Sequence, residues 1–164
     1  MRYRRLRVQG GTYFFTVVTS GRKPVFGNSD AIRVLQRSIA VIRRRHPFAI
    51  DAEVILPDHI HTIWSLPEGD SDFSTRWMLI KSAVSRDLGE RGESVWQKRF
   101  WEHLIRDDEE MAALVSYIHF NPVKHGLVSA PKDWLYSSFH SAVARGELPL
   151  NWGNQNNLKF TEEF

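Results

Sequence analysis

Two histidines separated by one apolar residue are the first group in the sequence that could do chemistry. His59 and His61 open an apolar, β-branched run that is typical of a strand, directly after Pro57 and Asp58. Side chains two positions apart on a strand point to the same side of a sheet, so both imidazoles can reach one ion. Imidazole is a common metal ligand. The pair therefore predicts half of a metal site, which other residues must complete.

A tyrosine and an asparagine stand four residues apart in a later helical pattern. Apolar residues recur at helical spacing from Met111 to Ile118, and Tyr117 and Asn121 fall on one flank of that apolar stripe. Because residues four apart are neighbours on a helix, a phenol and an amide oxygen can face one cleft. A second interpretation of Asn121 stays open: followed by Pro122, it is also typical of the cap of a new short helical turn.

These residue types together suit the chemistry of a phosphodiester. A site of nitrogen and oxygen ligands with open positions can hold Mg²⁺ or Mn²⁺ together with a phosphate oxygen. Tyrosine is a weak nucleophile near neutral pH until a nearby cation favours its phenolate. Attack by that phenolate on phosphorus would form a phosphotyrosine ester, which conserves the bond energy needed to rejoin the strand.

The elements that must position these groups favour an α+β fold. Strand patterns cover residues 12–19, 48–56, 59–66 and 98–105, and Pro57-Asp58 predicts an antiparallel hairpin between the second and third. Helices are expected to begin at Ser29 or Asp30, at Ser71 or Ser74, and at an Asp107 and Glu110 capping box. This order suggests a single antiparallel sheet of the ferredoxin-like or RNA-recognition-like kind, with helices packed on one face.

The composition describes an ordinary globular chain. Its 164 residues, 42% of them hydrophobic, predict a single domain over 1–164 with a basic arm over 1–10 and a C-terminal tail over 147–164. The absence of cysteine excludes disulfide scaffolds, thiolate zinc sites and cysteine nucleophiles. No apolar run approaches the roughly 18 residues that span a bilayer, so we expect a cytoplasmic protein without a membrane partner.

Basic residues are concentrated in the first third of the chain. The formal net charge is only +3, but residues 1–50 hold 11 of the 22 Lys and Arg residues against a single acid, Asp30. Arginines mixed with aromatic residues suit phosphate contacts and base stacking, which favours a nucleic-acid partner for the N-terminal arm. The cluster over 43–45 is open to two interpretations, because arginines also complement the C-terminal end of a helix.

Three ordered segments together resemble the REP-associated tyrosine transposases, which are bacterial relatives of the single-tyrosine HUH insertion-sequence transposases. The segments are Pro57-Asp58-His59-Ile60-His61, the run from Tyr117 to Val128, and Trp134-Leu135-Tyr136-Ser137-Ser138. The resemblance covers most of the chain. It implies that His59, His61 and Asn121 bind a divalent metal, Mg²⁺ or Mn²⁺, and that Tyr117 attacks single-stranded DNA, leaving a 5′-phosphotyrosine and a free 3′-OH.

The resemblance also implies a substrate and an assembly. Family members recognise imperfect palindromic REP hairpins with a short guide tetranucleotide at the hairpin foot. This branch is expected to act as a monomer; insertion-sequence relatives exchange the tyrosine helix between two chains, so a dimer stays open. The DNA-binding candidates rest on charge and stacking alone, and they are Arg2, Arg4, Arg5, Arg7, Lys98, Arg99, Trp101 and Lys124.

The remaining histidines are not expected to bind metal. The five other histidines are expected in packing or surface positions: His46, His103, His119, His125 and His140.

One alternative function is a hairpin-binding module of the same lineage without catalysis. The other is an unrelated histidine-metal hydrolase in which water attacks and no protein–DNA adduct forms. For the transposase hypothesis, the histidine strand and the Tyr117 helix must lie side by side.

Overall fold

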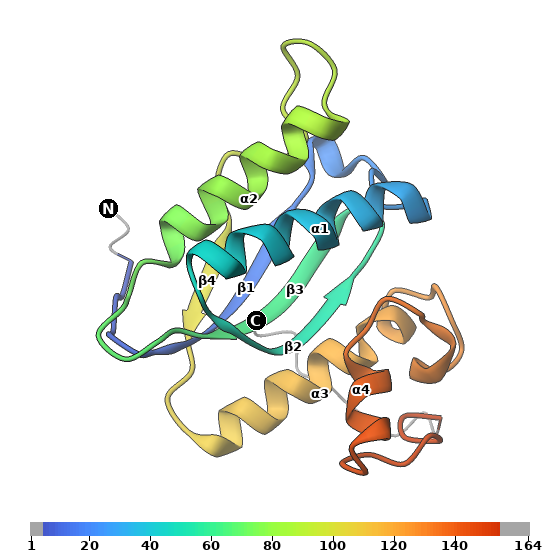
Figure 1. Ribbon diagram of the computed structural model, residues 1–164. Helices are drawn as coiled ribbons and strands as arrows, with labels where there is room; N and C mark the ends of the chain where they lie inside the picture. Colours follow the sequence, from blue (N-terminus) through green and yellow to red (C-terminus); the bar gives the residue numbers. More distant parts are fainter. Residues whose placement is uncertain (1–4, 155–164) are drawn as a thin grey trace.

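A four-stranded antiparallel sheet in the order β2-β3-β1-β4 forms the centre of the computed structural model, which describes residues 5–154 (Figure 1). Arg2, Arg4 and the end of the predicted tail lie outside these residues. The α+β sheet fold is confirmed. No helix of the described part has the length and hydropathy needed to cross a membrane. The elements are β1 (Thr12–Val18), η1 (Ser20–Arg22), α1 (Ser29–Arg45), β2 (Ala49–Ile55), β3 (His59–Ser65), α2 (Phe73–Leu88), β4 (Trp101–Leu104), α3 (Asp108–Lys124), η2 (Pro131–Asp133) and α4 (Phe139–Ala144).

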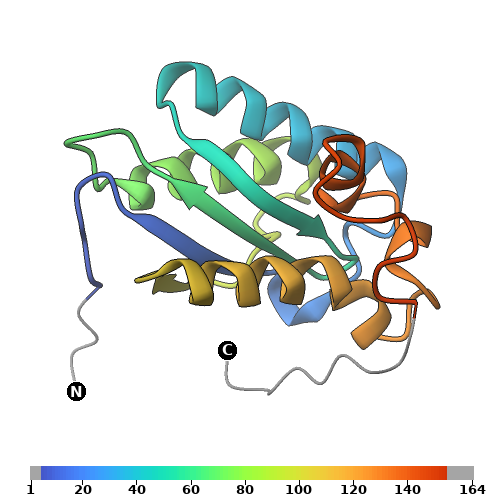
Figure 2. The ribbon, with the colours of Figure 1, turned by 90° about the horizontal axis from the view of Figure 1, so that it is seen from below.

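The long helices cover both faces of the sheet (Figure 2). α1 and α2 pack on one face over the larger apolar core, in which the Trp64 and Trp77 rings stack with centroids 4.3 Å apart. α3 packs on the other face against a smaller cluster that includes Phe14, Ile63 and Ile118. The expectation that the helices share one face is therefore wrong. The physical reason is that β1 and β3 carry apolar side chains on both faces, so each face needs a cover.

β3 is an inner strand, paired antiparallel with β1 on one side and β2 on the other. Its register places His61 opposite Thr16 of β1 and Ile60 opposite Ile55 of β2, which confirms the predicted hairpin through Pro57-Asp58. All its residues from His59 to Trp64 are buried. A slip by one residue would turn both histidines to the opposite face, so burial on both faces fixes their direction.

Each long helix begins at a side-chain cap, although not always at the predicted residue. Asp107 accepts a hydrogen bond from the Glu110 backbone N–H, as the capping box predicts. α1 and α2 are capped instead by Asn28 and Asp72, one residue before Ser29 and two before Ser74. Strand β4 is shorter than expected and begins at Trp101. The basic residues predicted at its start therefore lie in the preceding connection.

Glu53 of β2 carries a carboxyl group that is partly shielded from solvent. Its Oε2 is shielded from solvent and has no hydrogen-bond partner among the described residues, although the residue as a whole is only half-buried. Burial raises the pKa of Glu53 to about 7, against the opposing effects of the Thr62 hydroxyl and the Arg43 charge. The group therefore changes charge near neutral pH, well above the usual range of a carboxylic acid.

We expect Glu53→Gln to remove the loss of stability that ionisation of this carboxyl group causes at high pH. The folded pKa of Glu53 lies above its unfolded value of 4.5, so its favourable effect is present at low pH and is lost as the pH rises through about 7. At pH 8 the wild type should be less stable than the variant by an amount on the order of 3 kcal/mol. Urea unfolding at about pH 5 and about pH 8 measures this difference. The exposed Glu90→Gln is the matched control, and an equal pH dependence in wild type and Glu53→Gln would contradict the assignment.

Candidate active site

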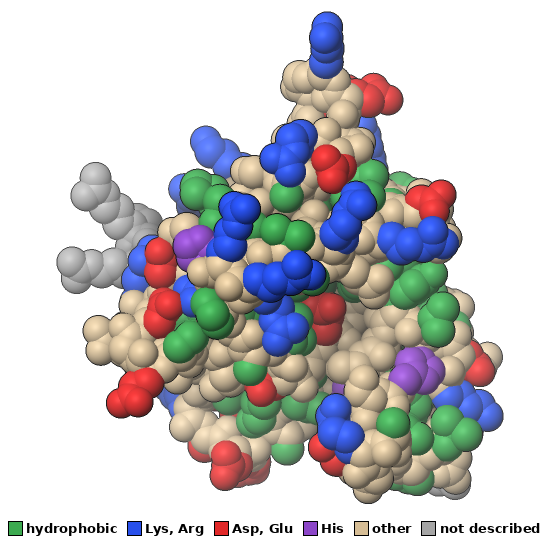
Figure 3. All heavy atoms as spheres, viewed as in Figure 1, with side chains coloured by type: hydrophobic (Ala, Val, Ile, Leu, Met, Phe, Trp, Pro, Cys, Tyr) green, Lys and Arg blue, Asp and Glu red, His purple; other side chains and the backbone are tan. Residues whose placement is uncertain are grey.

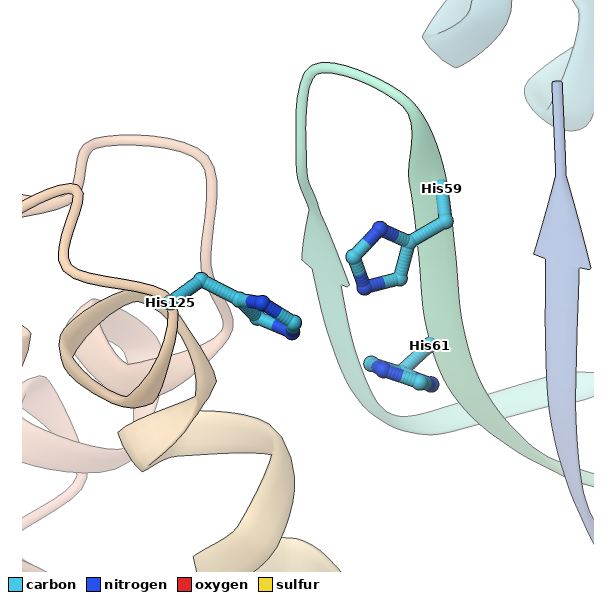
Figure 4. A group of neighbouring side chains, drawn as sticks. All are labelled: His59, His61 and His125. Atoms are coloured by element: carbon cyan, nitrogen blue, oxygen red, sulfur yellow. The ribbon is translucent and has the colours of Figure 1, made fainter. Parts of the chain in front are cut away.

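Three histidines meet on the α3 side of the sheet (Figure 4). His59 and His61 come from β3, and His125 is the residue that ends α3. One ring nitrogen of each histidine lies within 4.8 Å of those of the other two. The ring centroid of His59 lies 4.8 Å from that of His61 and 5.0 Å from that of His125. Since all three rings face one space, they form a group that could hold a metal ion.

The position of His125 corrects the expectation that it serves only packing or the surface. α3 continues through Pro122 to Lys124 instead of stopping at Asn121. The interpretation of Asn121-Pro122 as the cap of a new turn is therefore wrong, and the continued helix carries His125 to the histidine strand. The sequence held a signal for this: His125 follows Tyr117 by eight residues and Asn121 by four, so all three lie on one helical flank.

Asn121 is completely buried beside the histidine pair. Its side chain lies close enough to His59 to favour the protonated form of that ring, yet neither amide atom makes a hydrogen bond of regular geometry within residues 5–154. Burial of an amide without such a bond costs about 1–3 kcal/mol. The amide is thus an unsatisfied polar group at the edge of the histidine cluster.

Two hydrogen bonds orient the strand histidines. His59 Nδ1 lies 2.6 Å from Asp58 Oδ1, and His61 Nδ1 lies 2.8 Å from Thr16 Oγ1. With Nδ1 occupied in both rings, Nε2 is left for a ligand. Asp58 also accepts a hydrogen bond from Arg22 at 3.1 Å, and Arg22 has a positive φ of 52°. A residue other than glycine rarely adopts this backbone conformation. The turn at Arg22 therefore has an unusual backbone, and its guanidinium group contacts Asp58.

The electrostatic environment keeps the histidines neutral. Burial lowers the pKa of His61 well below its usual value, and the nearby His59, His125 and Lys124 lower it further. Burial also lowers the pKa of His59, although Asp58 opposes this effect. Partial burial acts to raise the pKa of Asp58, but its hydrogen bonds with His59 and Arg22 outweigh burial and leave that pKa lowered. Neutral imidazoles offer a free lone pair, as metal binding requires.

Tyr117 lies against the histidine strand, as the predicted geometry requires. Its ring centroid is 5.3 Å from that of His61, and the residue is 7% exposed. The Lys124 Nζ lies 3.5 Å from the phenolic oxygen and 4.9 Å from the ring centroid. Lys124, a phosphate-contact candidate of the sequence, follows Tyr117 by seven residues, and the structure places its positive charge directly beside the phenol. Tyr117, Lys124 and the histidines therefore share one site within a single chain.

The other DNA-binding candidates fall into two groups. Arg5 and Arg7 both donate to Ser74 Oγ, and the Arg5 guanidinium lies 4.2 Å from the centroid of the Phe100 ring. Their guanidinium groups are therefore partly engaged in contacts within the protein, which leaves fewer N–H groups for DNA phosphates. Trp101 is 40% exposed at the start of β4, directly after the exposed segment that carries Lys98 and Arg99.

Trp101 also lies on the same side of the sheet as the histidine cluster. Its ring packs edge-on against Phe14, whose own ring stacks on His61.

Three of the remaining histidines have structural partners, as expected. His119 Nε2 lies 2.9 Å from Ser138 Oγ, and His140 Nε2 lies 2.7 Å from the Trp134 carbonyl oxygen. His103 forms a hydrogen bond with Glu110. None of these side chains belongs to the histidine cluster of the described chain.

Comparisons with known proteins indicate the family of the chain. No family model matches the chain. A protein of Escherichia coli (strain K12), described as a REP-associated tyrosine transposase, is 45% identical over 150 residues, which cover 92% of this chain and 89% of that protein. A protein of Haemophilus influenzae, assigned provisionally to the same family, is 40% identical over 96% of both chains.

A solved structure gives the same assignment. It is described as the REP-associated tyrosine transposase bound to a REP hairpin. It matches this chain with a TM-score of 0.88 and 42% identity, over 98% of this chain and 95% of that one. Sequence identity of this extent, over nearly the whole chain and with the same fold, shows that the chain belongs to the REP-associated tyrosine transposases.

Proposed function

We propose that this protein is a metal-dependent single-strand endonuclease and strand transferase that binds REP-type DNA hairpins and cleaves through a 5′-phosphotyrosine on Tyr117. The observation that carries the proposal is the convergence of Tyr117 with His59, His61 and His125 on one face of the sheet. The solved relative in complex with a REP hairpin supports the choice of substrate. Because the site forms within one chain, the proposed unit is a monomer with a single domain.

The residues present fit a divalent metal ion. His59, His61 and His125 offer three neutral imidazoles, and the buried Asn121 amide beside them lacks a regular partner. Three nitrogen donors favour Mn²⁺ or another transition metal over Mg²⁺, which prefers oxygen ligands. When bound, the ion would polarise a phosphate oxygen and stabilise the charge that develops on the phosphoryl group. Asp58 and Thr16 would hold the two strand histidines in the correct orientation.

The protein groups account for the transfer itself. The Tyr117 oxygen attacks phosphorus as its proton passes to solvent, and the Lys124 ammonium stabilises the negative charge on that oxygen. The bond from phosphorus to the 3′ oxygen breaks, and the 3′ oxygen takes up a proton from solvent to become a free hydroxyl. Attack by a 3′-OH on the phosphotyrosine reverses these steps, restores a phosphodiester and frees Tyr117. The exposed Trp101 ring, with Lys98 and Arg99, is where the single strand would lie beside the site.

We expect Tyr117→Phe to abolish both cleavage and the covalent protein–DNA adduct, because the variant lacks the attacking oxygen. Hairpin affinity should stay within a few-fold of the wild type, since the ring contacts with Phe14 and His61 do not need the hydroxyl. A denaturing gel with a labelled hairpin, with and without Mn²⁺, measures cleavage and adduct together. Tyr136→Phe is the matched control. Cleavage by Tyr117→Phe would favour a hydrolase, and cleavage absent from the wild type would favour an inactive binding module.

His125→Ala should weaken Mn²⁺ binding at least tenfold, because it removes one of three nitrogen donors. Isothermal titration of Mn²⁺ into the DNA-free protein measures this affinity without reference to activity. His46→Ala, outside the histidine cluster of the described residues, is the matched control. An unchanged Mn²⁺ affinity in His125→Ala would exclude this residue as a ligand and leave Asn121 as the candidate.

Asp58→Asn should lower Mn²⁺ affinity by about 10- to 100-fold through the orientation of His59. The substitution keeps the size of the side chain but removes the charge that holds His59 Nδ1–H. The same titration measures the effect, and Asp51→Asn, on the exposed part of β2, controls for the loss of one negative charge. Equal affinities in the two variants would show that Asp58 does not position the ligand.

A further inference from the structure

Arginines gather on the outer surface of α1 and α2, on the side of the sheet opposite Tyr117. Figure 3 shows Lys and Arg side chains spread over these two helices on the viewed face. We call this surface the α1–α2 basic face, and its members on the two helices are Arg33, Arg37, Arg44, Arg45 and Arg86. All five are exposed. The proposed cleavage chemistry uses none of them.

A groove lies on this face between α1 and α2. The cavity has a volume of about 440 Å³. Arg37 and Arg45 of α1 and Arg86 of α2 line it, together with Asp87 and with small and apolar side chains such as Ser38, Ala83, Val41, Ile42 and Leu79. The three arginines stand around the same depression. A flexible polyanion could therefore contact cations from both helices at once.

The negative charges on this face do not neutralise it. Asp30 pairs with Arg33 at 3.3 Å, and Asp87 lies 3.8 Å from Arg37. Asp87 is also the acid nearest Arg86, at 3.6 Å. Such exposed ion pairs are weak, about 0–1 kcal/mol, and exchange readily for a stronger partner. Within residues 5–154, Arg44 and Arg45 have no ion-pair partner, so the face keeps an excess of positive charge.

A helix C-terminus explains only part of this charge. The macrodipole acts on the last turn of a helix, which accounts for Arg44 and Arg45 of α1 and for Arg86 of α2. It does not account for Arg33 and Arg37, which lie before the last turn of α1. Arg43, by contrast, has a structural task, because it donates to the Phe48 carbonyl oxygen at 3.0 Å and lies over the Phe48 ring. The arginines that remain are the ones that point away from the fold.

We propose that the α1–α2 basic face binds the phosphate backbone of double-stranded DNA, separately from the cleavage site on the other face. Arginine forks match phosphate oxygens in pairs. Arg33 and Arg45 stand 12 positions apart on α1, which is about 18 Å of helix and roughly half a turn of B-DNA. The exposed large apolar side chains of α1 and α2 are Val41 and Met78. Neither is aromatic, so the face offers backbone contacts and lacks the stacking platform that single strands need.

This inference adds a second DNA contact to the proposed function but does not depend on Tyr117 chemistry. A chain with both surfaces could stay on flanking duplex while its opposite face processes a hairpin or its single-stranded foot. Contacts of this kind carry no base information, so the face should bind any duplex sequence with a strong dependence on salt.

The test compares two variants that each remove three positive charges. R37Q/R45Q/R86Q changes the groove, and R91Q/R106Q/K132Q changes exposed basic residues elsewhere. The probe is a blunt duplex of arbitrary sequence about two helical turns long, and its affinity is measured over a range of salt concentrations. The groove variant should lower the slope of log affinity against log salt by about 2 to 3. Its affinity at low salt should fall tenfold or more, while the control variant stays within a few-fold of the wild type.

Further measurements separate this proposal from the cleavage mechanism. The single-turnover rate on a saturating hairpin should be unchanged in the groove variant, and Tyr117→Phe should bind the duplex as the wild type does. Thermal unfolding of both triple variants checks that the fold is intact. Equal salt slopes in the groove variant and the wild type would overturn the proposal. A fall in the saturated cleavage rate, or competition by polyglutamate as strong as that by duplex, would overturn it as well.

Discussion

The antiparallel pairing of β3 between β1 and β2 is the constraint on which the rest of the site depends. The pairing fixes which residues of β3 face α3, and it sets Thr16 beside His61 at hydrogen-bond distance. It also places Asp58, in the turn before β3, against His59. A one-residue slip of this inner strand would turn the histidines into the α1–α2 core and turn Ile60 and Trp64 towards α3. The imidazoles are therefore held by the same contacts that hold the sheet together.

The two faces of the sheet differ in the size of their apolar cores and in the polar groups that they bury. The α1–α2 side contains most of the large aromatic core, including Trp64, Trp77 and Phe15. The α3 side buries less apolar surface and accepts polar groups such as Asn121 and His119. Buried polar groups without full hydrogen bonding reduce stability. The stronger core on one side allows the other to hold the Tyr117 phenol beside Lys124 and an unsatisfied amide.

Electrostatics reinforce this division. Around the cluster, burial and mutual repulsion keep the histidines neutral, and the positive charge next to the phenol comes from Lys124. Charge of this kind stabilises an anionic oxygen and a phosphate at the same place. On the opposite side of the sheet, arginines stand in solvent, and some of them pair with Asp30 or Asp87. Salt screens such exposed charges, so their interactions weaken as the salt concentration rises.

The sequence by itself determined the sheet fold, the strand with the histidine pair and the helix with Tyr117, because each rests on local periodicity and capping. The identity of the family also followed from ordered motifs. Tertiary structure alone decided that α3 covers a face of its own and that it continues past Pro122. Local signals favoured a stop at Asn121-Pro122, whereas packing of α3 along β2 and β3 favoured one longer helix. His125 joined the cluster for that reason: three ring nitrogens can converge only when the ends of two distant elements are brought together, which no spacing along one element encodes.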